Sequence, residues 1–280
     1  MCNNLQCDMN YINSFRHSVT VIDTETTHLI PEKCEIVEIA GARCINNTWV
    51  TDNMLLGSYD PIPPEASAKN NISKKMIAGL LPFNKSLDKV EKILDWPTSR
   101  YWVAHNAGYD RAALKTAFGR IKNDEYVAIC DDLSRWICTW RLSKHILINE
   151  FDDTQYGLSY LRYRLDLDIP DSTGVHRADA DTLVCAKLLD KLIEIGVSNG
   201  TLNANEELGP QLTELSWRFI PIKKWPIGGK HKGVLLTDLD NDYYSWALKT
   251  LDQLKEGSPT YDADLAESII LVLSKRLEEA

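Results

Sequence analysis

Two acidic residues, Asp23 and Glu25, lie two positions apart at the end of an apolar segment that begins at Val19. In an extended strand, side chains two positions apart point to the same side. Two carboxylates placed in this way repel each other and resist burial unless a cation neutralises them. Hard divalent ions such as Mg²⁺ prefer carboxylate oxygens, so the pair is compatible with a metal site. Taken alone, the Asp-x-Glu pattern fits a solvated strand end better.

A second polar cluster, His105-Asn106-Ala107-Gly108-Tyr109-Asp110, follows the apolar segment Tyr101–Ala104 and opens a predicted helix. Asp110 falls in the first helical turn, where a carboxylate interacts favourably with the helix dipole and could simply cap the helix. His105 and Asn106 could orient neighbouring groups by hydrogen bonds, or merely end the strand. Tyr109 is expected to be a packing residue.

A third cluster, His176-Arg177-Ala178-Asp179-Ala180-Asp181, opens the clearest predicted helix. Five residues along a helix correspond to about 500° of rotation. His176 and Asp181 can therefore share a site only if His176 lies in the preceding loop, which residues 170–174 supply. Asp181 is in line with the apolar face of the helix, where a carboxylate needs a partner such as a metal ion. Asp179 lies off that line and fits a solvated acid.

Together the three clusters resemble the motifs of the DEDDh exonucleases, the DnaQ-like family with an RNase H-like fold. The first motif matches Asp23-Thr24-Glu25-Thr26-Thr27, the second matches residues 105–110, and the third matches residues 176–181. The tyrosine branch of the family would carry Tyr four residues before Asp181. This chain has Arg177 there, so it resembles the histidine branch. The resemblance covers residues 19–191.

The resemblance implies a 3′→5′ exonuclease that uses two Mg²⁺ or Mn²⁺ ions roughly 4 Å apart. In this arrangement Asp23 bridges both ions, Glu25 and Asp181 complete one coordination shell, and Asp110 contacts the other ion through water. His176, with an ordinary pKa near 6.5, accepts the proton of the attacking water. The expected substrate is the 3′ end of a nucleic acid, DNA in preference to RNA, and the expected products are nucleoside 5′-monophosphates.

Two positions depart from the usual family pattern, and both flank the substrate groove in relatives. The family usually has Gly where this chain has His28, and often has His where it has Asn70. Leu29 and Ile30 follow on the same loop and could pack on a terminal base, or only anchor the loop. The residues predicted to contact substrate in this domain are Thr26, His28, Leu29, Ile30, Asn70, His105 and Asn106.

The chain also carries the periodicities of an α/β fold. Three segments rich in β-branched residues with turns between them indicate an antiparallel meander. Strands followed by alternating strands and helices indicate a sheet covered by helices, and the resemblance makes this a mixed five-stranded sheet with a small C-terminal domain. The predicted strands are Val19–Asp23, Ile36–Ile45, Trp49–Leu56, Tyr101–Ala104 and Tyr126–Cys130, and the main predicted helices are Ala107–Phe118, Arg135–Ile148, Gly157–Leu165 and Ala178–Ile195.

Composition suggests four regions. Residues 1–17 are polar and fit an N-terminal tail, and residues 18–195 hold the exonuclease motifs. Residues 196–215 contain several Asn, Gly and Ser residues, which is the composition of a linker. Residues 216–280 are left as a small C-terminal domain.

The C-terminal region combines positive charge with aromatic residues. Arg218, Lys223, Lys224, Lys230 and Lys232 occur in a segment without Asp or Glu from Ser216 through Gly233. Trp217, Phe219 and Trp225 are interleaved with them, a mixture that suits a nucleic-acid strand by charge and by stacking. The turn at residues 228–233 resembles a glycine-lysine turn in the tail of some family members. A solvated basic loop over an aromatic core is the alternative.

Overall composition is that of an ordinary globular protein, with 280 residues, 44% hydrophobic and 25% charged, and a net charge of −9. A protein this acidic is a poor general nucleic-acid coat, because phosphate contacts need Lys and Arg. Seven cysteines without a Cys-x-x-Cys pair argue against disulfides and structural zinc. We expect a cytoplasmic protein, since neither a signal peptide nor a membrane span is evident. A homodimer is left open.

Two alternatives remain at this stage. An exoribonuclease or oligoribonuclease of the same fold would differ in contacts to the 2′-hydroxyl, which the sequence does not reveal. An inactive nucleic-acid-binding module would require loss of a catalytic residue, and all five are present.

Overall fold

The chain divides into two compact units, Met1–Arg218 and Phe219–Ala280. The computed structural model describes residues 12–147, 155–169, 177–256 and 261–279. Each unit is described by itself. No helix within these ranges is both long and apolar enough to cross a membrane.

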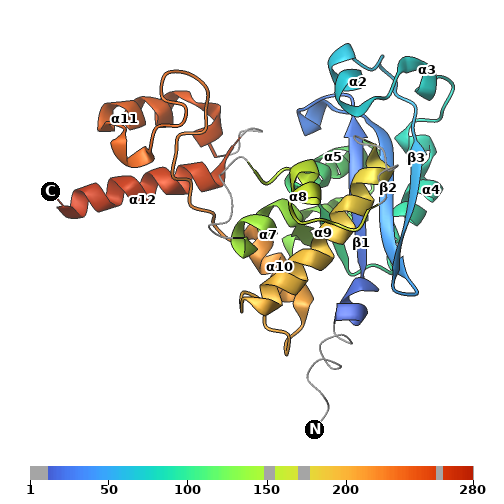
Figure 1. Cartoon of the computed structure of the whole chain (residues 1–280). Coiled ribbons are helices and arrows are strands. Elements are labelled where there is room, and N and C mark those ends of the chain that lie inside the picture. The colour runs from blue at the N-terminus through green and yellow to red at the C-terminus, as the bar shows by residue number, and fades with distance from the viewer. Residues whose placement is uncertain (1–11, 148–154, 170–176, 257–260, 280) are drawn as a thin grey trace, which may run out of the picture. The chain divides into compact units, whose positions relative to one another are not determined.

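A five-stranded mixed sheet forms the centre of the first unit (Figure 1). Its strand order is β3-β2-β1-β4-β5; β1 pairs antiparallel with β2 and parallel with β4, while β3 is antiparallel to β2 and β5 parallel to β4. The strands are β1 Val19–Thr26, β2 Ile36–Ile45, β3 Thr48–Leu55, β4 Tyr101–Ala104 and β5 Trp136–Cys138. The predicted fold class, an RNase H-like mixed sheet flanked by helices, is confirmed.

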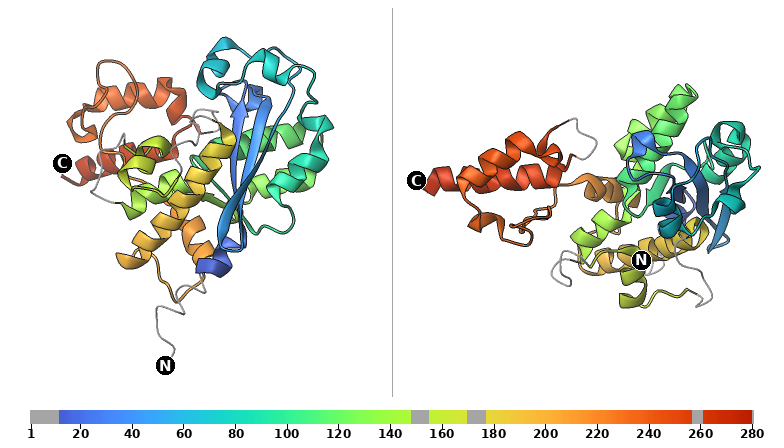
Figure 2. Two further views of the ribbon diagram at one scale, coloured as in Figure 1. Left: turned by 45° about the vertical axis from the view of Figure 1, so that its right-hand side comes forward. Right: turned by 90° about the horizontal axis from the view of Figure 1, so that it is seen from above.

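Helices cover both faces of this sheet (Figures 1 and 2). The helix α9 packs across β1, β2 and β3 on one face, whereas α4 and α5 pack on the other. The helices are α2 Pro64–Asn70, α3 Lys74–Ile77, α4 Leu87–Leu94, α5 Ala107–Arg120, α6 Asp124–Asp131, α7 Thr139–Ile146, α8 Leu158–Arg164, α9 Ala178–Ser198 and α10 Leu208–Trp217.

Alternation along β1 separates two hydrophobic cores. Val19 and Val21 contribute to the core beneath α9, whereas Ile22 contributes to the core beneath α4 and α5. Successive strand residues point to opposite faces. Asp23 and Glu25 continue the series of Val19 and Val21, so their carboxylates emerge on the face that α9 covers.

The secondary-structure prediction was wrong in two segments. Tyr126–Cys130 was predicted as a strand but lies in α6, where Asn123 caps the helix by accepting a hydrogen bond from the Tyr126 amide at 3.3 Å. Tyr126, Ile129 and Cys130 are buried at the spacing of one helix face. A short apolar segment of this length does not by itself distinguish a helix from a strand. The predicted helix Arg135–Ile148 begins instead with strand β5 and continues as α7.

The predicted N-terminal tail extends too far. Residues 12–16 are helical, Phe15 is buried in the core beneath α9, and Arg16 forms an ion pair with Asp190 of α9 at 2.6 Å. An apolar and a charged anchor thus attach this segment to the first unit. Residues 1–11 lie outside the described residues.

The predicted linker 196–215 is also corrected, because α10 belongs to the core of the first unit. Leu202, Leu208, Leu212 and Leu215 are buried there, and the Cys138 amide of β5 donates to the Ser216 hydroxyl at 2.8 Å. A Cβ added at Gly209 would lie 2.2 Å from the Tyr101 ring, so the close approach of α10 to β4 requires glycine. The polar composition of 196–207 hid the apolar spacing that follows it.

The second unit has its own core around Trp225, Tyr244 and Leu265. Its helices are α11 Asn241–Thr250 and α12 Ala263–Glu279. The unit boundary lies after Arg218, so residues 216–218, predicted to be part of the C-terminal domain, belong to the nuclease unit. The Trp217 indole N–H donates to the Trp136 carbonyl at 3.0 Å within that unit.

Loss of packing at α10 should therefore destabilise the nuclease fold. Leu212 is fully buried, and we expect Leu212→Ala to reduce the free energy of unfolding by about 2–5 kcal/mol. Glu214→Ala on the exposed side of the same helix should change it by less than about 0.5 kcal/mol. Urea denaturation of both variants measures this difference, and equal effects would show that α10 is a linker after all.

Candidate active site

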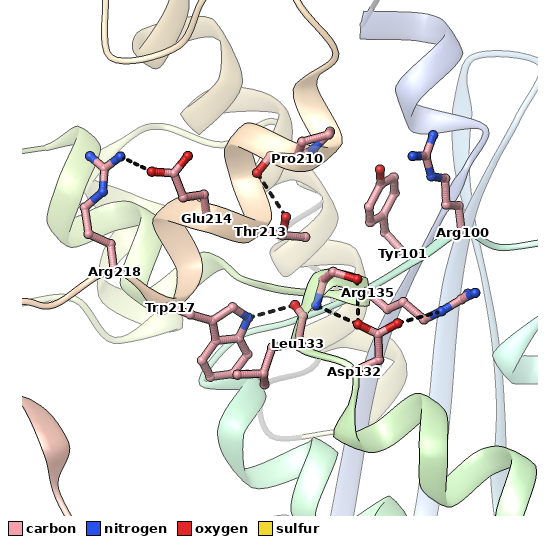
Figure 3. A pocket seen from close by; sticks show the side chains of 11 residues that line it. Arg100, Tyr101, Asp132, Leu133, Arg135, Pro210, Thr213, Glu214, Trp217 and Arg218 are labelled. Atoms are coloured by element: carbon pink, nitrogen blue, oxygen red, sulfur yellow. Dashed lines mark hydrogen bonds and ion pairs between the residues drawn. The ribbon is translucent and has the colours of Figure 1, made fainter.

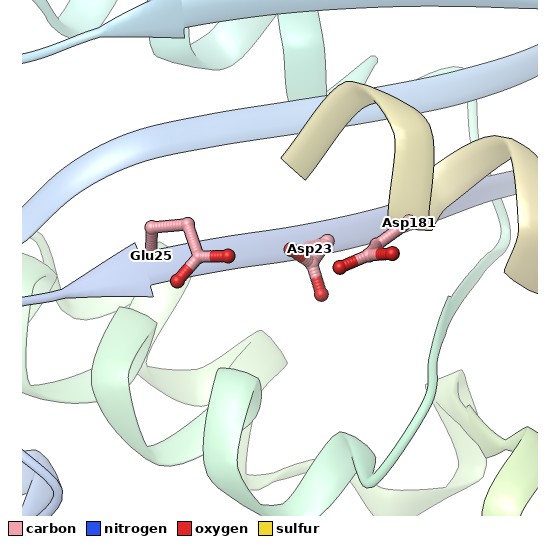
Figure 4. Close-up of side chains that lie close together, drawn as sticks. All are labelled: Asp23, Glu25 and Asp181. Carbon is pink, nitrogen blue, oxygen red and sulfur yellow. The ribbon is translucent and has the colours of Figure 1, made fainter. Parts of the chain in front are cut away.

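Three carboxylates meet at the C-terminal half of β1 (Figure 4). Asp23 and Glu25 project from β1, and Asp181 projects from the first turn of α9. One oxygen from each side chain lies within 4.8 Å of the others. The sequence predicted this grouping from the resemblance of the three motifs to the DEDDh exonucleases, and strand alternation predicted that Asp23 and Glu25 share one side of β1.

Asp110 is buried beside this cluster, although it is not one of the three grouped residues. One of its oxygens accepts two hydrogen bonds from Thr24, from the amide at 3.0 Å and from the hydroxyl at 2.8 Å. Burial raises the pKa of Asp110 from 3.8 to about 7, and the Thr24 bonds oppose that change. Asp110 is thus held in place from β1, the strand that carries Asp23.

The carboxylates are poorly compatible with simultaneous ionisation. Burial raises the pKa of Glu25 from 4.5 to about 8, and the charges of Asp181, Glu38 and Asp110 add to the effect. Burial also raises the pKa of Asp23 well above its usual range, with Asp110 and Glu25 as the next causes. A group of oxygen ligands whose negative charges destabilise one another fits a hard divalent cation.

An additional buried carboxylate, Glu38 of β2, lies directly opposite Glu25 in the strand register. Arg177 binds it through two nitrogens, at 2.7 and 3.1 Å, and the Ala178 amide donates to it at 3.3 Å. A bidentate guanidinium–carboxylate pair fixes geometry as well as charge. Glu38 therefore anchors the start of α9, the helix that carries Asp181.

The importance of this anchor was missed in the sequence, where Arg177 served only to exclude the tyrosine branch. The available signal was an ionisable residue in the centre of the apolar strand Ile36–Ile45, a position that requires a charged partner when both faces are covered. His176, the predicted base, precedes Arg177 and lies outside the described residues.

The loop after β1 is held by side-chain hydrogen bonds. The Tyr109 hydroxyl donates to the His28 carbonyl at 2.6 Å and also contacts the Thr26 hydroxyl. The His28 ring accepts from the Ile30 amide at 2.8 Å through Nδ1. Tyr109, expected only to pack, thus fixes the loop, and it leaves Leu29 68% exposed.

Two predicted substrate residues are already engaged within the protein. Asn70 is buried; its amide donates to the Thr26 carbonyl at 3.4 Å, and its oxygen accepts from the Ile72 amide at 3.0 Å. The His105 ring lies 3.0 Å from both the Thr139 hydroxyl and the Tyr156 carbonyl. Both side chains thus support neighbouring segments, and their contact with substrate stays a prediction.

Burial of His105 lowers its pKa to about 4, so the ring is neutral at pH 7. Because the Tyr156 carbonyl can only accept, Nε2 must carry the proton, and the Thr139 hydroxyl then donates to Nδ1. Asn106, by contrast, is exposed, in left-handed conformation with φ 67° immediately before α5.

A pocket of about 620 Å³ lies elsewhere in the first unit, near the start of β4 (Figure 3). None of the carboxylates described above lines it. Two of its guanidinium groups are paired with neighbouring acids, Arg135 with Asp132 at 3.3 Å and Arg218 with Glu214 at 2.6 Å. Arg218 is therefore not an unpaired cation for a nucleic-acid strand.

Comparison with known proteins now decides the family. The model of the exonuclease family RNase_T matches residues 20–189, which is more than half of the chain. The chain belongs to this family. The match spans Asp23, Glu25, Asp110 and Asp181, so the carboxylate cluster lies inside the exonuclease region, and the chain is a nuclease by family.

Individual relatives are consistent with this assignment. Exodeoxyribonuclease 10 of Escherichia coli K12 is 27% identical over 243 residues, covering 84% of this chain and 92% of the relative. The structure of exonuclease X in complex with 5′ overhanging duplex DNA has 25% identity and a TM-score of 0.51, and the match covers 71% of this chain and 99% of that one. The resemblance to DEDDh exonucleases is confirmed.

A more distant structure supports the fold alone. Escherichia coli exonuclease I in complex with a dT13 oligonucleotide is 12% identical, with a TM-score of 0.53, and the match covers 65% of this chain and 42% of that chain.

The raised pKa values predict how metal and pH act on stability. Without a cation, the folded protein retains protons on Glu25 and Asp110 that the unfolded chain releases at lower pH. The free energy of unfolding should then fall as pH rises from about 5 to 8. Because a bound cation replaces these protons, we expect the rise in melting temperature caused by Mg²⁺ to grow across the same pH range.

Thermal denaturation in EDTA and in Mg²⁺ at several pH values measures this dependence. Asp179→Asn, two residues from Asp181, should preserve it, whereas Asp181→Asn should reduce it. A Mg²⁺ effect that is independent of pH would show that the cluster does not exchange protons for metal.

Proposed function

We propose that the chain is a metal-dependent 3′→5′ exonuclease that hydrolyses phosphodiester bonds at the 3′ end of DNA and releases nucleoside 5′-monophosphates. The observation that carries the proposal is the grouping of Asp23, Glu25 and Asp181 within 4.8 Å inside an exonuclease-family domain. The 3′→5′ direction is supported by the resemblance of the three motifs to DEDDh exonucleases.

The residues present fit a divalent metal centre, and the family resemblance supports two Mg²⁺ or Mn²⁺ ions in it. All ligand atoms offered are carboxylate oxygens, and their ionised forms destabilise one another in the absence of a cation. Asp23, Glu25 and Asp181 would hold metal directly, and Asp110 would act beside them. When bound, such ions activate a water molecule and stabilise charge on the leaving oxygen.

The protein contributes proton transfer and orientation. His176 takes the proton of the attacking water, in the role of general base. Glu38 and Arg177 orient the start of α9 through their ion pair of 2.7 Å, immediately after the base in sequence. Their contribution is to position Asp181, and they have no direct contact with the reacting atoms in this scheme.

The loop after β1 provides a surface for the terminal nucleotide. Leu29 is exposed on a loop that Thr26, His28 and Tyr109 hold in one conformation. An apolar side chain on a fixed loop can pack on a base without a loss of loop entropy on binding. The preference for DNA is supported by the relatives named exodeoxyribonuclease 10 and exonuclease X. A cytoplasmic location and a homodimer stay predictions from the sequence.

Two substitutions should separate the metal ligand from the base. Asp181→Asn should weaken Mn²⁺ binding and abolish release of nucleotides, because it removes a ligand. His176→Ala should reduce turnover by about 10²–10⁴-fold, the usual effect of losing a general base, with Mn²⁺ affinity retained. Progressive shortening of matched DNA and RNA oligomers labelled at the 5′ end measures turnover. Calorimetry measures the affinity for Mn²⁺.

Asp179→Asn serves as the matched control, since it removes the same functional group from the same helical turn. Wild-type turnover in Asp181→Asn would reject the metal site. A loss of Mn²⁺ affinity in His176→Ala would make this residue a ligand, and shortening from the 5′ end would reject the proposed direction.

A further inference from the structure

A set of aromatic rings lies together in the second unit. Tyr243 of α11 contacts the ring of His231 at 4.2 Å, the ring of Trp246 at 5.3 Å and the ring of Trp225 at 5.1 Å between centroids. Trp225 is buried in the core of the unit, whereas Trp246 is 48% exposed and Tyr243 and His231 are partly exposed. The accessible surface of this aromatic set is therefore formed by His231, Tyr243 and Trp246.

This result changes the interpretation of the aromatic residues in the sequence. Trp217 and Trp225 suggested a stacking surface in the sequence. Trp217 packs against the core beneath α4 and α5 of the first unit, and Trp225 lies in the core of the second unit. Tyr243 and Trp246 lie three residues apart on one side of α11, and the fold brings His231 from a separate segment against Tyr243. Exposed aromatic rings in a row are the surfaces on which successive bases of a single strand stack.

Four exposed lysines accompany these rings. Lys230 and Lys232 flank His231 in sequence, and Lys223 and Lys224 precede Trp225. None of the four forms an ion pair with any residue in the described ranges. Residues 219–280 hold eight Lys and Arg residues against ten Asp and Glu residues, a net charge of −2. The positive charge is thus concentrated in one segment of an acidic unit.

The lysine segment is held by backbone hydrogen bonds. The Trp225 amide donates to the Val234 carbonyl at 2.8 Å, the Gly233 amide donates to the Trp225 carbonyl at 2.9 Å, and the Leu236 amide donates to the Lys223 carbonyl at 2.8 Å. The turn between these pairs uses Gly229 with φ 109° and Gly233 with φ 81°, conformations that favour glycine. The backbone of the lysine segment is therefore fixed, and its Trp225 and His231 rings contact Tyr243.

We propose that His231, Tyr243 and Trp246, together with Lys223, Lys224, Lys230 and Lys232, form a surface that binds a single nucleic-acid strand. The rings stack on bases and the lysines contact phosphates. Asp240 and Asp242, which lie beside Tyr243 in the chain, limit the positive charge on that side. The inference rests on the proposed nuclease function only in taking nucleic acid as the substrate.

A second binding surface on the same chain raises the local concentration of a long strand near the nuclease unit. It offers nothing to a substrate of two or three nucleotides. The surface should therefore increase the affinity for long strands and leave hydrolysis of very short oligomers unchanged.

Binding of a labelled 30-nucleotide strand to the full-length protein in EDTA, at several salt concentrations, tests the proposal. Each phosphate contact to a single strand contributes about 0.7 to the slope of log affinity against log salt. Lys230→Ala/Lys232→Ala should lower the magnitude of this slope by about 1.4. Trp246→Ala should weaken binding about 5- to 150-fold, the effect of losing one stacked base, with the slope nearly unchanged.

Controls separate this surface from general charge. Lys255→Ala/Lys275→Ala removes the same formal charge from outside the 223–232 segment and should leave the slope as in the wild type. Trp246→Phe keeps an aromatic face and should retain most of the affinity. Equal losses are expected with DNA and RNA strands of one sequence, because rings and lysines do not read the 2′-hydroxyl; a loss with only one would assign the surface to that nucleic acid.

Three results would overturn the proposal: an unchanged salt slope in Lys230→Ala/Lys232→Ala, an equal decrease in the control variant, or binding of blunt duplex as tight as that of the single strand. Because binding is measured without metal, a wild-type protein that fails to release nucleotides would reject the nuclease function alone. An active enzyme with unchanged slopes would reject the surface alone.

Discussion

Electrostatic repulsion between Asp23, Glu25 and Asp181 is the interaction that the rest of the site has to offset. The fold brings the three carboxylates within 4.8 Å of one another at the C-terminal half of the central strand β1, where burial and mutual repulsion raise the pKa of Glu25 to about 8. Ionised carboxylates in such an arrangement are unfavourable without a cation and become favourable when a divalent cation is bound. Strain at functional sites of this kind is normally offset by the surrounding fold.

The surrounding elements keep the carboxylates together through separate interactions. Alternation along β1 directs Asp23 and Glu25 toward α9, and the apolar face of α9 packs on the same side of the sheet. The ion pair between Glu38 and Arg177 attaches the start of α9 to β2. Glu38 adds a negative charge to the site and Arg177 compensates it, so the pair fixes the helix with little net change in charge.

Sequence reasoning succeeded where one local rule decided the outcome. The two-residue spacing predicted that Asp23 and Glu25 share one side of their strand, and the apolar-face position of Asp181 indicated a need for a partner. Their convergence in one site with Asp110 came from the resemblance to the family motifs. Sequence reasoning failed where a tertiary contact overrode the local pattern. The hydrogen bonds that hold Asn70 and His105 to Thr26, Thr139 and Tyr156 are tertiary contacts of this kind, which no local pattern indicated. The segment 196–215 has the composition of a linker, yet Leu208, Leu212 and Leu215 complete the nuclease core. His231 and Tyr243, whose ring centroids lie 4.2 Å apart, come from separate segments and leave no periodic signal in the sequence.

The exchange of protons for metal at the carboxylate cluster can be measured directly. Calorimetric titration of Mn²⁺ into the full-length protein at pH 7, in two buffers of different ionisation enthalpy, gives the number of protons released on binding. We predict release of about one proton or more per protein, because carboxyl groups with raised pKa values must ionise to bind metal. Binding without proton release, or undiminished binding in Asp181→Asn, would contradict a metal site built on these carboxylates.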